Sequence, residues 1–80
     1  MENVLPRITE ILIDKLNLAP SQVTLEANFI KDLGIDSLDY VELIMDFEQV
    51  FDIRIADTEG ESLKTVGDAV RLIQGKLAEK

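Results

Sequence analysis

The sequence predicts an all-α fold, a small four-helix bundle with three main helices and one short helix. Apolar residues recur every three or four positions in three separate segments. Residues suited to helix N-caps precede two of these segments. Strand signals are poor, because the one alternating stretch, residues 51–55, has no second strand with which to pair. With 80 residues and no linker or repeat, we expect a single domain, residues 1–80.

The first helix is expected over residues 5–16. Pro6 fits its first turn, where a missing backbone N–H is harmless, and Asn17 is expected to end it. Its apolar residues have helical spacing. They are Leu5, Ile8, Leu12 and Leu16, with Ile11 beside them.

Residues 18–35 are expected to form a long connection, with a turn at Pro20-Ser21. A connection of this length in a small domain is more often functional than not. Apolar residues are expected to anchor it to the core. They are Phe29, Ile30, Leu33 and Ile35.

The second helix is expected to begin at Ser37 and to run to about Phe51, with Asp36 as its N-cap and Asp39 at the spacing of a capping box. A short helical turn is expected over residues 56–61. Thr65 is expected to cap the last helix, with Asp68 three residues on. The residues that this last helix should bury are Val66, Ala69, Val70, Ile73 and Leu77.

Two apolar stripes run along the second helix on a helical wheel. The wide stripe is a core face, formed by Tyr40, Leu43, Ile44, Phe47, Val50 and Phe51. The narrow stripe is Leu38, Val41 and Met45, and acidic residues flank it on both sides. Packing against one neighbour does not require a second stripe, so a partner with an apolar spot inside a basic ring is favoured. The alternative is that Leu38 and Val41 pack under the long connection.

Composition excludes several classes of function. Cys and His are both absent, so the chain lacks a thiol nucleophile, the commonest general base and the commonest metal ligand. We therefore expect neither an enzyme nor a specific metal site. No apolar run approaches the ~20 residues that a membrane span needs. No signal peptide is visible either, so we expect a cytoplasmic protein without stable membrane insertion. We also expect a monomer.

The net charge of −8 is concentrated in one segment. Residues 32–61 hold ten acidic residues and one basic residue, Arg54, for a net charge of −9. Such a segment argues against nucleic-acid binding, because a polyanion needs Lys and Arg opposite it. It favours basic protein partners, because the negative electrostatic field of this segment would attract them and speed their association. The alternative is that the acidic residues only keep a small domain soluble.

Ser37 stands out because Asp36 already fits the role of the cap, which leaves the serine hydroxyl free to face solvent. The N-terminal end of a helix suits a phosphate. Asp36 and Asp39 would repel one, however, so local electrostatics alone do not select a phosphate at this position. A covalent link would not depend on that affinity. Gly34 gives the backbone freedom just before the site.

The segment from Leu33 to Phe51, taken as a whole, resembles the prosthetic-group site of the bacterial-type acyl carrier proteins of fatty acid synthesis. The matching residues are Leu33, Gly34, Asp36, Ser37, Leu38, Asp39, Val41, Glu42, Leu43, Met45, Glu48 and Phe51. The match continues through residues 53–57 and 65–69, so the resemblance covers essentially the whole chain.

The resemblance implies a carrier without catalytic activity of its own. A phosphopantetheinyl transferase would attach 4'-phosphopantetheine, from coenzyme A, to Ser37, as O-(pantetheine 4'-phosphoryl)serine. The thiol of this arm would carry growing acyl chains as thioesters, sheltered between the second helix and the later helices. Ketosynthase, reductases, dehydratase and acyltransferases would dock through basic patches. The docking residues implied are Asp36, Leu38, Asp39, Val41, Glu42, Met45 and Glu48.

A few positions depart from the pattern of this family. Ala56 replaces a frequent Pro, and Gln49 and Val50 replace frequent acidic residues. Tyr40 is larger than is usual at its position, and we expect it to narrow access to the acyl pocket. The length of acyl chain that the protein prefers is therefore left open.

A specialised carrier for polyketide, lipopolysaccharide or aminoacyl groups stays open, and so does an acidic adaptor domain without a prosthetic group. The spacing Asp32-x-Gly34-x-Asp36 superficially suggests a calcium-binding EF-hand loop. It is rejected, because Ser37 replaces the required Gly and Leu43 stands at the twelfth position.

Overall fold

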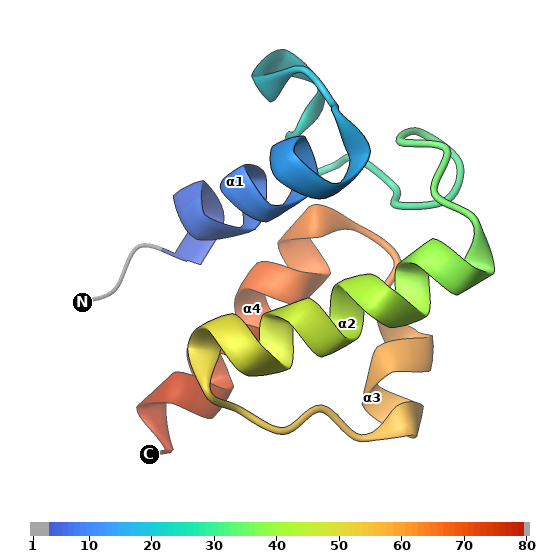
Figure 1. Ribbon diagram of the computed structural model, residues 1–80. Coiled ribbons are helices and arrows are strands. Elements are labelled where there is room, and N and C mark those ends of the chain that lie inside the picture. The colour runs from blue at the N-terminus through green and yellow to red at the C-terminus, as the bar shows by residue number, and fades with distance from the viewer. Residues whose placement is uncertain (1–3, 80) are drawn as a thin grey trace.

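The computed structural model describes residues 4–79. Its α-helices are α1 (Val4–Leu16), α2 (Ser37–Phe51), α3 (Asp57–Ser62) and α4 (Val66–Ala78), and a 3-10 turn, η1, spans Pro20–Gln22. α1 packs against both α2 and α4. The short α3 lies on the same side as the end of the long connection that leads into α2 (Figure 1). The all-α prediction of three main helices and one short helix is therefore confirmed.

The helix ends agree with local sequence signals to within a residue. Asn17 ends α1 in the left-handed conformation, with φ of 57°, and its N–H donates to the carbonyl of Ile13. α2 has the predicted bounds. α1 begins one residue earlier than predicted, because the wholly buried Val4 belongs to its core face. α3 begins one residue later than predicted, because Ala56 is its N-cap.

The core joins one apolar face from each long helix. α1 contributes Val4, Ile8 and Leu12; α2 contributes Leu43, Phe47 and Phe51; and α4 contributes Val66, Ala69 and Ile73. No polar residue is buried in the described part of the chain. Burial of these apolar faces is the main force that holds the helices together.

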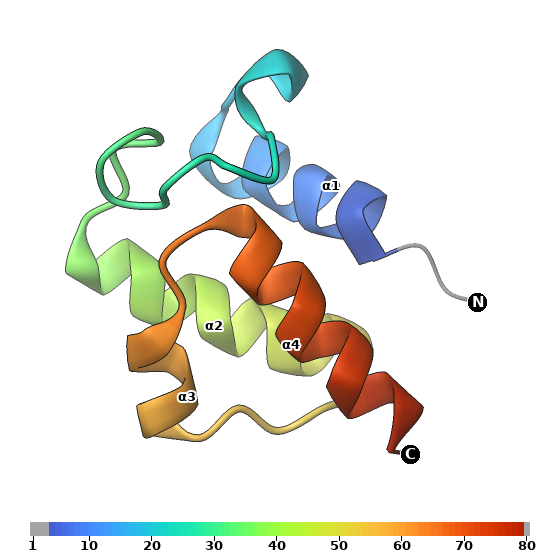
Figure 2. The ribbon, with the colours of Figure 1, turned by 180° about the vertical axis from the view of Figure 1, so that it is seen from behind.

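The long connection is tied to the start of α4. Asn28 and Thr65 form an isolated β-bridge, and the N–H of Phe29 donates to the carbonyl of Lys64. Gly67 in α4 donates to the carbonyl of Leu25, and a Cβ at Gly67 would lie only 3.0 Å from that oxygen. From behind, the connection is seen to run beside the link between α3 and α4 (Figure 2). This tie positions the segment that leads into α2.

Two residues predicted to be buried are exposed. Ile30 was predicted to anchor the connection but is 51% exposed. The Asn28 side chain accepts hydrogen bonds from the N–H groups of Ile30 and Lys31, which folds a turn that leaves Ile30 outside. Val50 was predicted to lie on the core face of α2 but is 40% exposed. It lines a shallow depression between α1 and α2, at the edge of the core stripe.

Other expected core residues are only partly buried. They pack against the edge of the core and are Leu5, Ile11, Leu16, Tyr40, Ile44, Val70 and Leu77. The predicted anchors Phe29, Leu33 and Ile35 are buried, as expected. Within residues 4–79, no helix has the length and apolar character needed to span a membrane.

Candidate functional site

The start of α2 leaves one hydroxyl unused. Asp36 has extended backbone geometry, and its Oδ1 accepts a hydrogen bond of 2.8 Å from the N–H of Asp39. This bond confirms Asp36 as the N-cap. Ser37, the first residue of the helix, is exposed, and its hydroxyl makes no hydrogen bond within the described residues. The hydroxyl is therefore accessible to an enzyme that would attach a group to it.

Only one half of a capping box forms at this helix start. The side chain of Asp39 makes no hydrogen bond back to Asp36 within residues 4–79. Asp39 therefore keeps its carboxylate available at the N-terminal end of α2, where a negative charge is also favoured by the helix dipole.

The narrow apolar stripe of α2 faces solvent. Leu38 is 75% exposed, Val41 is 56% exposed and Met45 is 54% exposed. The alternative that Leu38 and Val41 pack beneath the long connection is therefore wrong. Large apolar side chains gathered on one helix face are typical of a protein interaction surface. We call the stripe and its four acidic neighbours the α2 face. Its residues are Asp36, Leu38, Asp39, Val41, Glu42, Met45 and Glu48.

A lysine from α1 reaches the edge of the α2 face. Lys15 Nζ lies 3.2 Å from a carboxylate oxygen of Glu42 and 3.1 Å from one of Asp46. Hydrogen bonds to Asp46 and then to Glu42 raise the pKa of Lys15 above its ordinary value. The sequence does not indicate this contact, because residues 15 and 42 are brought together only by helix packing. Glu42 is thus partly neutralised, whereas Asp36 and Asp39 are not paired with a cation among the described residues.

Glu48 is turned toward the connection between α2 and α3. Its Oε2 accepts a hydrogen bond of 2.9 Å from the N–H of Ile55. This contact holds the chain that follows α2 against the helix. Glu48 therefore has a structural partner within its own chain, unlike the carboxylate of Asp39.

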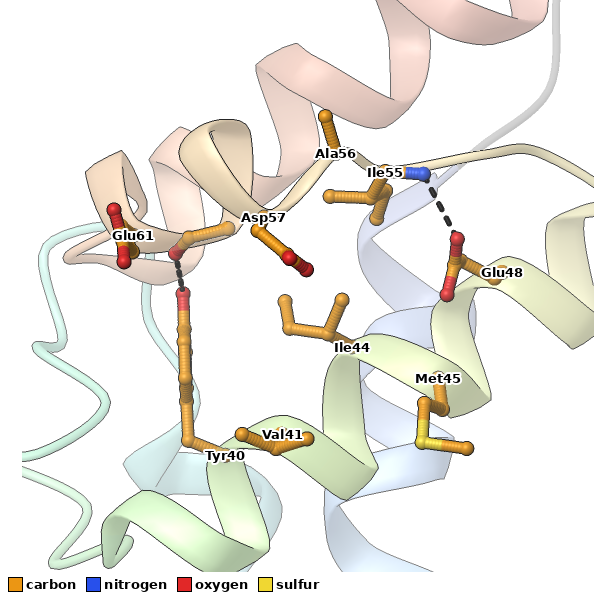
Figure 3. A pocket seen from close by; sticks show the side chains of 10 residues that line it. Tyr40, Val41, Ile44, Met45, Glu48, Ile55, Ala56, Asp57 and Glu61 are labelled. Atoms are coloured by element: carbon orange, nitrogen blue, oxygen red, sulfur yellow. Dashed lines mark hydrogen bonds between the residues drawn. The ribbon is translucent and has the colours of Figure 1, made fainter.

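A pocket opens between α2 and α3, with a volume of about 460 Å³ (Figure 3). Its lining is mainly apolar on the α2 side and acidic at the α3 rim. The lining residues are Tyr40, Val41, Ile44, Met45, Glu48, Ile55, Ala56, Asp57, Gly60 and Glu61. Val41 and Met45 belong both to this pocket and to the α2 face. A partner bound to the α2 face would therefore contact residues that also line the pocket.

Tyr40 crosses from α2 to the segment around α3. Its Oη lies 2.6 Å from the carbonyl oxygen of Gly60 and 3.0 Å from that of Leu63, toward which it can donate (Figure 3). Its ring centroid lies 5.7 Å from that of the buried Phe29. Burial, and secondarily the charge of Asp68, raise the pKa of Tyr40 to about 12. The phenol is therefore protonated at neutral pH and remains a donor.

No cluster of acidic side chains in residues 4–79 is arranged to hold a metal ion. What the arrangement offers is an exposed hydroxyl at the start of a helix, an apolar and acidic face after it, and an apolar pocket alongside. This combination suits attachment and presentation of a group rather than catalysis.

Comparisons with known proteins agree with this arrangement. Residues 6–73 match the family described as PP-binding, phosphopantetheine attachment site. The chain is 51% identical, over 80 residues, to the acyl carrier protein of Amoebophilus asiaticus, and the match covers 100% of both chains. It is 53% identical, over 77 residues, to the acyl carrier protein of Phenylobacterium zucineum, which covers 96% of this chain and 98% of that protein.

A solved structure has the same fold. The crystal structure of an acyl carrier protein from Thermotoga maritima superimposes with a TM-score of 0.83 at 34% sequence identity. The match covers 95% of this chain and 88% of that chain. The order and packing of the helices are therefore those of a known carrier fold.

Proposed function

Because the chain belongs to the family of phosphopantetheine-binding acyl carrier proteins, we propose that Ser37 is the residue that bears its prosthetic group. The chain is a carrier without catalytic activity of its own, and 4'-phosphopantetheine is its prosthetic group. The observation that carries the proposal for Ser37 is its exposed hydroxyl, left unused at the start of α2 because Asp36 supplies the cap.

The residues around Ser37 fit such an attachment. The hydroxyl faces solvent, so a transferase can reach it without unfolding the helix. Phosphopantetheinyl transferase would move the group from coenzyme A to this oxygen. When bound, the arm supplies a thiol, which the chain itself lacks. Asp36 would hold the first turn of α2 in place while the group is attached.

The α2 face is proposed as the docking surface for the transferase and for the enzymes of fatty acid synthesis. These enzymes would be ketosynthase, reductases, dehydratase and acyltransferases. Leu38, Val41 and Met45 would enter an apolar spot of the partner, and the flanking carboxylates would meet its Lys and Arg. Among the acidic residues, Asp39 is expected to contribute most, because one oxygen of Asp36 already accepts a hydrogen bond from the N–H of Asp39. Lys15 already neutralises part of Glu42, and Ile55 already binds one oxygen of Glu48.

The pocket between α2 and α3 is proposed as the shelter of the acyl chain. Ile44 and Ile55 line it, and burial of each methylene group there would stabilise the loaded form by up to about 0.8 kcal/mol. The family membership also supports a monomeric, cytoplasmic carrier formed by residues 1–80 as a single domain.

Ser37→Ala tests the attachment site. The purified chain is incubated with coenzyme A, Mg²⁺ and a phosphopantetheinyl transferase, and its intact mass is measured. The wild type should gain one phosphopantetheinyl group, and Ser37→Ala should gain none, because the attacking oxygen is gone. Helical content should be unchanged, since Asp36 rather than Ser37 caps α2.

Ser21→Ala is a matched control, because Ser21 is also an exposed serine at a helical turn. It should be loaded as the wild type is. Loading of Ser37→Ala would place the attachment elsewhere. A folded wild type that stays unmodified while a known carrier is loaded in the same mixture would support an adaptor domain instead.

A further inference from the structure

We propose that Tyr40 is a specificity-determining residue, whose ring forms one end wall of the α2–α3 pocket and so limits the length of acyl chain that the pocket shelters. This role rests on the proposed function, because it takes the pocket as the place of the acyl chain.

The pocket is bounded at both ends by contacts that join α2 to the residues after it. At one end, the Tyr40 hydroxyl lies against the Gly60 carbonyl. At the other end, the N–H of Ile55 donates to Glu48. Figure 3 shows Tyr40 and Glu48 at opposite ends, with Ile44 between them. A chain in the pocket therefore has a bounded space of about 460 Å³.

The Tyr40 wall is held from several directions. Its hydroxyl has two carbonyl oxygens within hydrogen-bond distance, those of Gly60 and Leu63. Its ring lies against Phe29, which is buried in the core. Contacts from α3, the long connection and the α3–α4 link thus keep the ring in place. A side chain held this way cannot swing aside for a longer guest without breaking several contacts.

The opposite end is less firmly closed. Glu48 is only partly buried, and a single hydrogen bond joins it to Ile55. Solvent can replace that bond when the carboxylate moves. Of the two ends, the Tyr40 end is therefore the one that resists extension of the pocket toward the core.

Shortening Tyr40 should lengthen the pocket, whereas adding a methyl group at Gly60 should narrow it. A Cβ at Gly60 would lie 3.9 Å from Cγ1 of Ile44, an ordinary contact across the pocket, so Gly60→Ala should fold. Tyr40→Phe keeps the ring and removes only the hydroxyl. Tyr40→Ala therefore tests the bulk of the ring, Tyr40→Phe tests the hydrogen bonds of its hydroxyl, and Gly60→Ala tests the width of the pocket.

The test measures melting temperature along a series of saturated acyl groups, each two carbons longer than the last, attached to the phosphopantetheine-loaded protein. For the wild type, the melting temperature should rise with chain length and then level off. The levelling-off length should be at least one step longer in Tyr40→Ala, at least one step shorter in Gly60→Ala, and unchanged in Tyr40→Phe. Tyr40→Leu replaces Tyr40→Ala if the latter has lost helical content.

An unchanged levelling-off length in folded Tyr40→Ala or Tyr40→Leu would overturn the role of Tyr40. If the levelling-off length shifted as much in Tyr40→Phe as in Tyr40→Ala, the proposal that the ring limits the chain length would be wrong, because the ring alone would not limit it. A melting temperature that no acyl group raises would overturn the use of this pocket. Failure of the proposed function looks different, because intact mass would then show no group on Ser37 before any acyl chain is added.

Discussion

α2 and α4 are two amphipathic helices of similar length, but their N-terminal ends are used differently. At α4, Thr65 Oγ1 accepts from the N–H of Asp68, and Asp68 accepts in return from the N–H of Thr65. Asp68 also accepts from Lys64 and pairs with Arg71. At α2, one such side-chain bond forms among residues 4–79, from the N–H of Asp39 to Asp36. The polar side chains at the start of α4 are occupied by its own fold, whereas the Ser37 hydroxyl and the Asp39 carboxylate at the start of α2 remain available.

The apolar residues differ in the same way. α4 buries Val66, Ala69 and Ile73, and its other large apolar residues, Val70, Leu72 and Leu77, pack at the edge of the core. α2 buries one stripe and exposes a second one, which begins at Leu38. The comparison teaches that the proposed docking surface lies where groups capable of contact are left unused by the fold.

The largest expected effect contrasts a buried residue of α4 with an exposed one of α2. Ile73→Ala should lower the free energy of unfolding by about 2–5 kcal/mol, because it leaves a cavity in the core. Leu38→Ala should change it by less than about 0.5 kcal/mol. Leu38→Ala should instead slow loading by the transferase. Urea unfolding and initial loading rates measure the two effects, and equal destabilisation by the two variants would contradict the contrast.

A smaller effect is expected from the carboxylates at the two helix starts. Asp68→Ala should cost about 1–2 kcal/mol of stability, because two backbone N–H groups lose their acceptor. Asp39→Ala should cost no more than a few tenths of a kcal/mol, although it loses a favourable interaction with the helix dipole. Thermal or urea unfolding of both variants at neutral pH measures the difference. Equal losses would mean that Asp39 also holds its helix.

The Asp68 carboxylate should also affect stability in acid. Backbone hydrogen bonds from Lys64 and then Thr65 lower the pKa of Asp68 in the folded protein. The unfolded chain therefore takes up this proton first as the pH falls, so the contribution of Asp68 is full above about pH 4 and is lost as the pH drops through the lowered pKa. Asp68→Ala should show a shallower loss of stability below about pH 4 than the wild type. A loss as steep as that of the wild type would argue against this role.

The smallest effect expected is that of salt. The segment of residues 32–61 carries a net charge of −9, so repulsion within it should be relieved as ionic strength rises from about 0.01 M to about 0.15 M. The melting temperature should rise slightly, and Asp39→Asn should reduce that rise. A melting temperature that falls with salt would show that ion pairs, such as those of Lys15 and Arg71, outweigh the repulsion.

The sequence by itself determined the main helices, the caps Asp36 and Thr65, the second apolar stripe of α2 and the place of Ser37. These features depend on contacts between residues three or four positions apart, whose geometry a helix imposes on any chain. The acidic segment is also a property of the sequence alone. The family resemblance then linked Ser37 to the phosphopantetheine arm, which local charges could not do.

Only the tertiary structure decided which of these residues have partners elsewhere in the chain. It paired Lys15 with Glu42, and it placed the hydroxyl of Tyr40 against Gly60 and Leu63. It also left Ile30 and Val50 exposed, although their sequence positions predicted burial. Such contacts join residues far apart in the chain. They depend on how the helices and the long connection pack together, and helical periodicity carries no information about that packing.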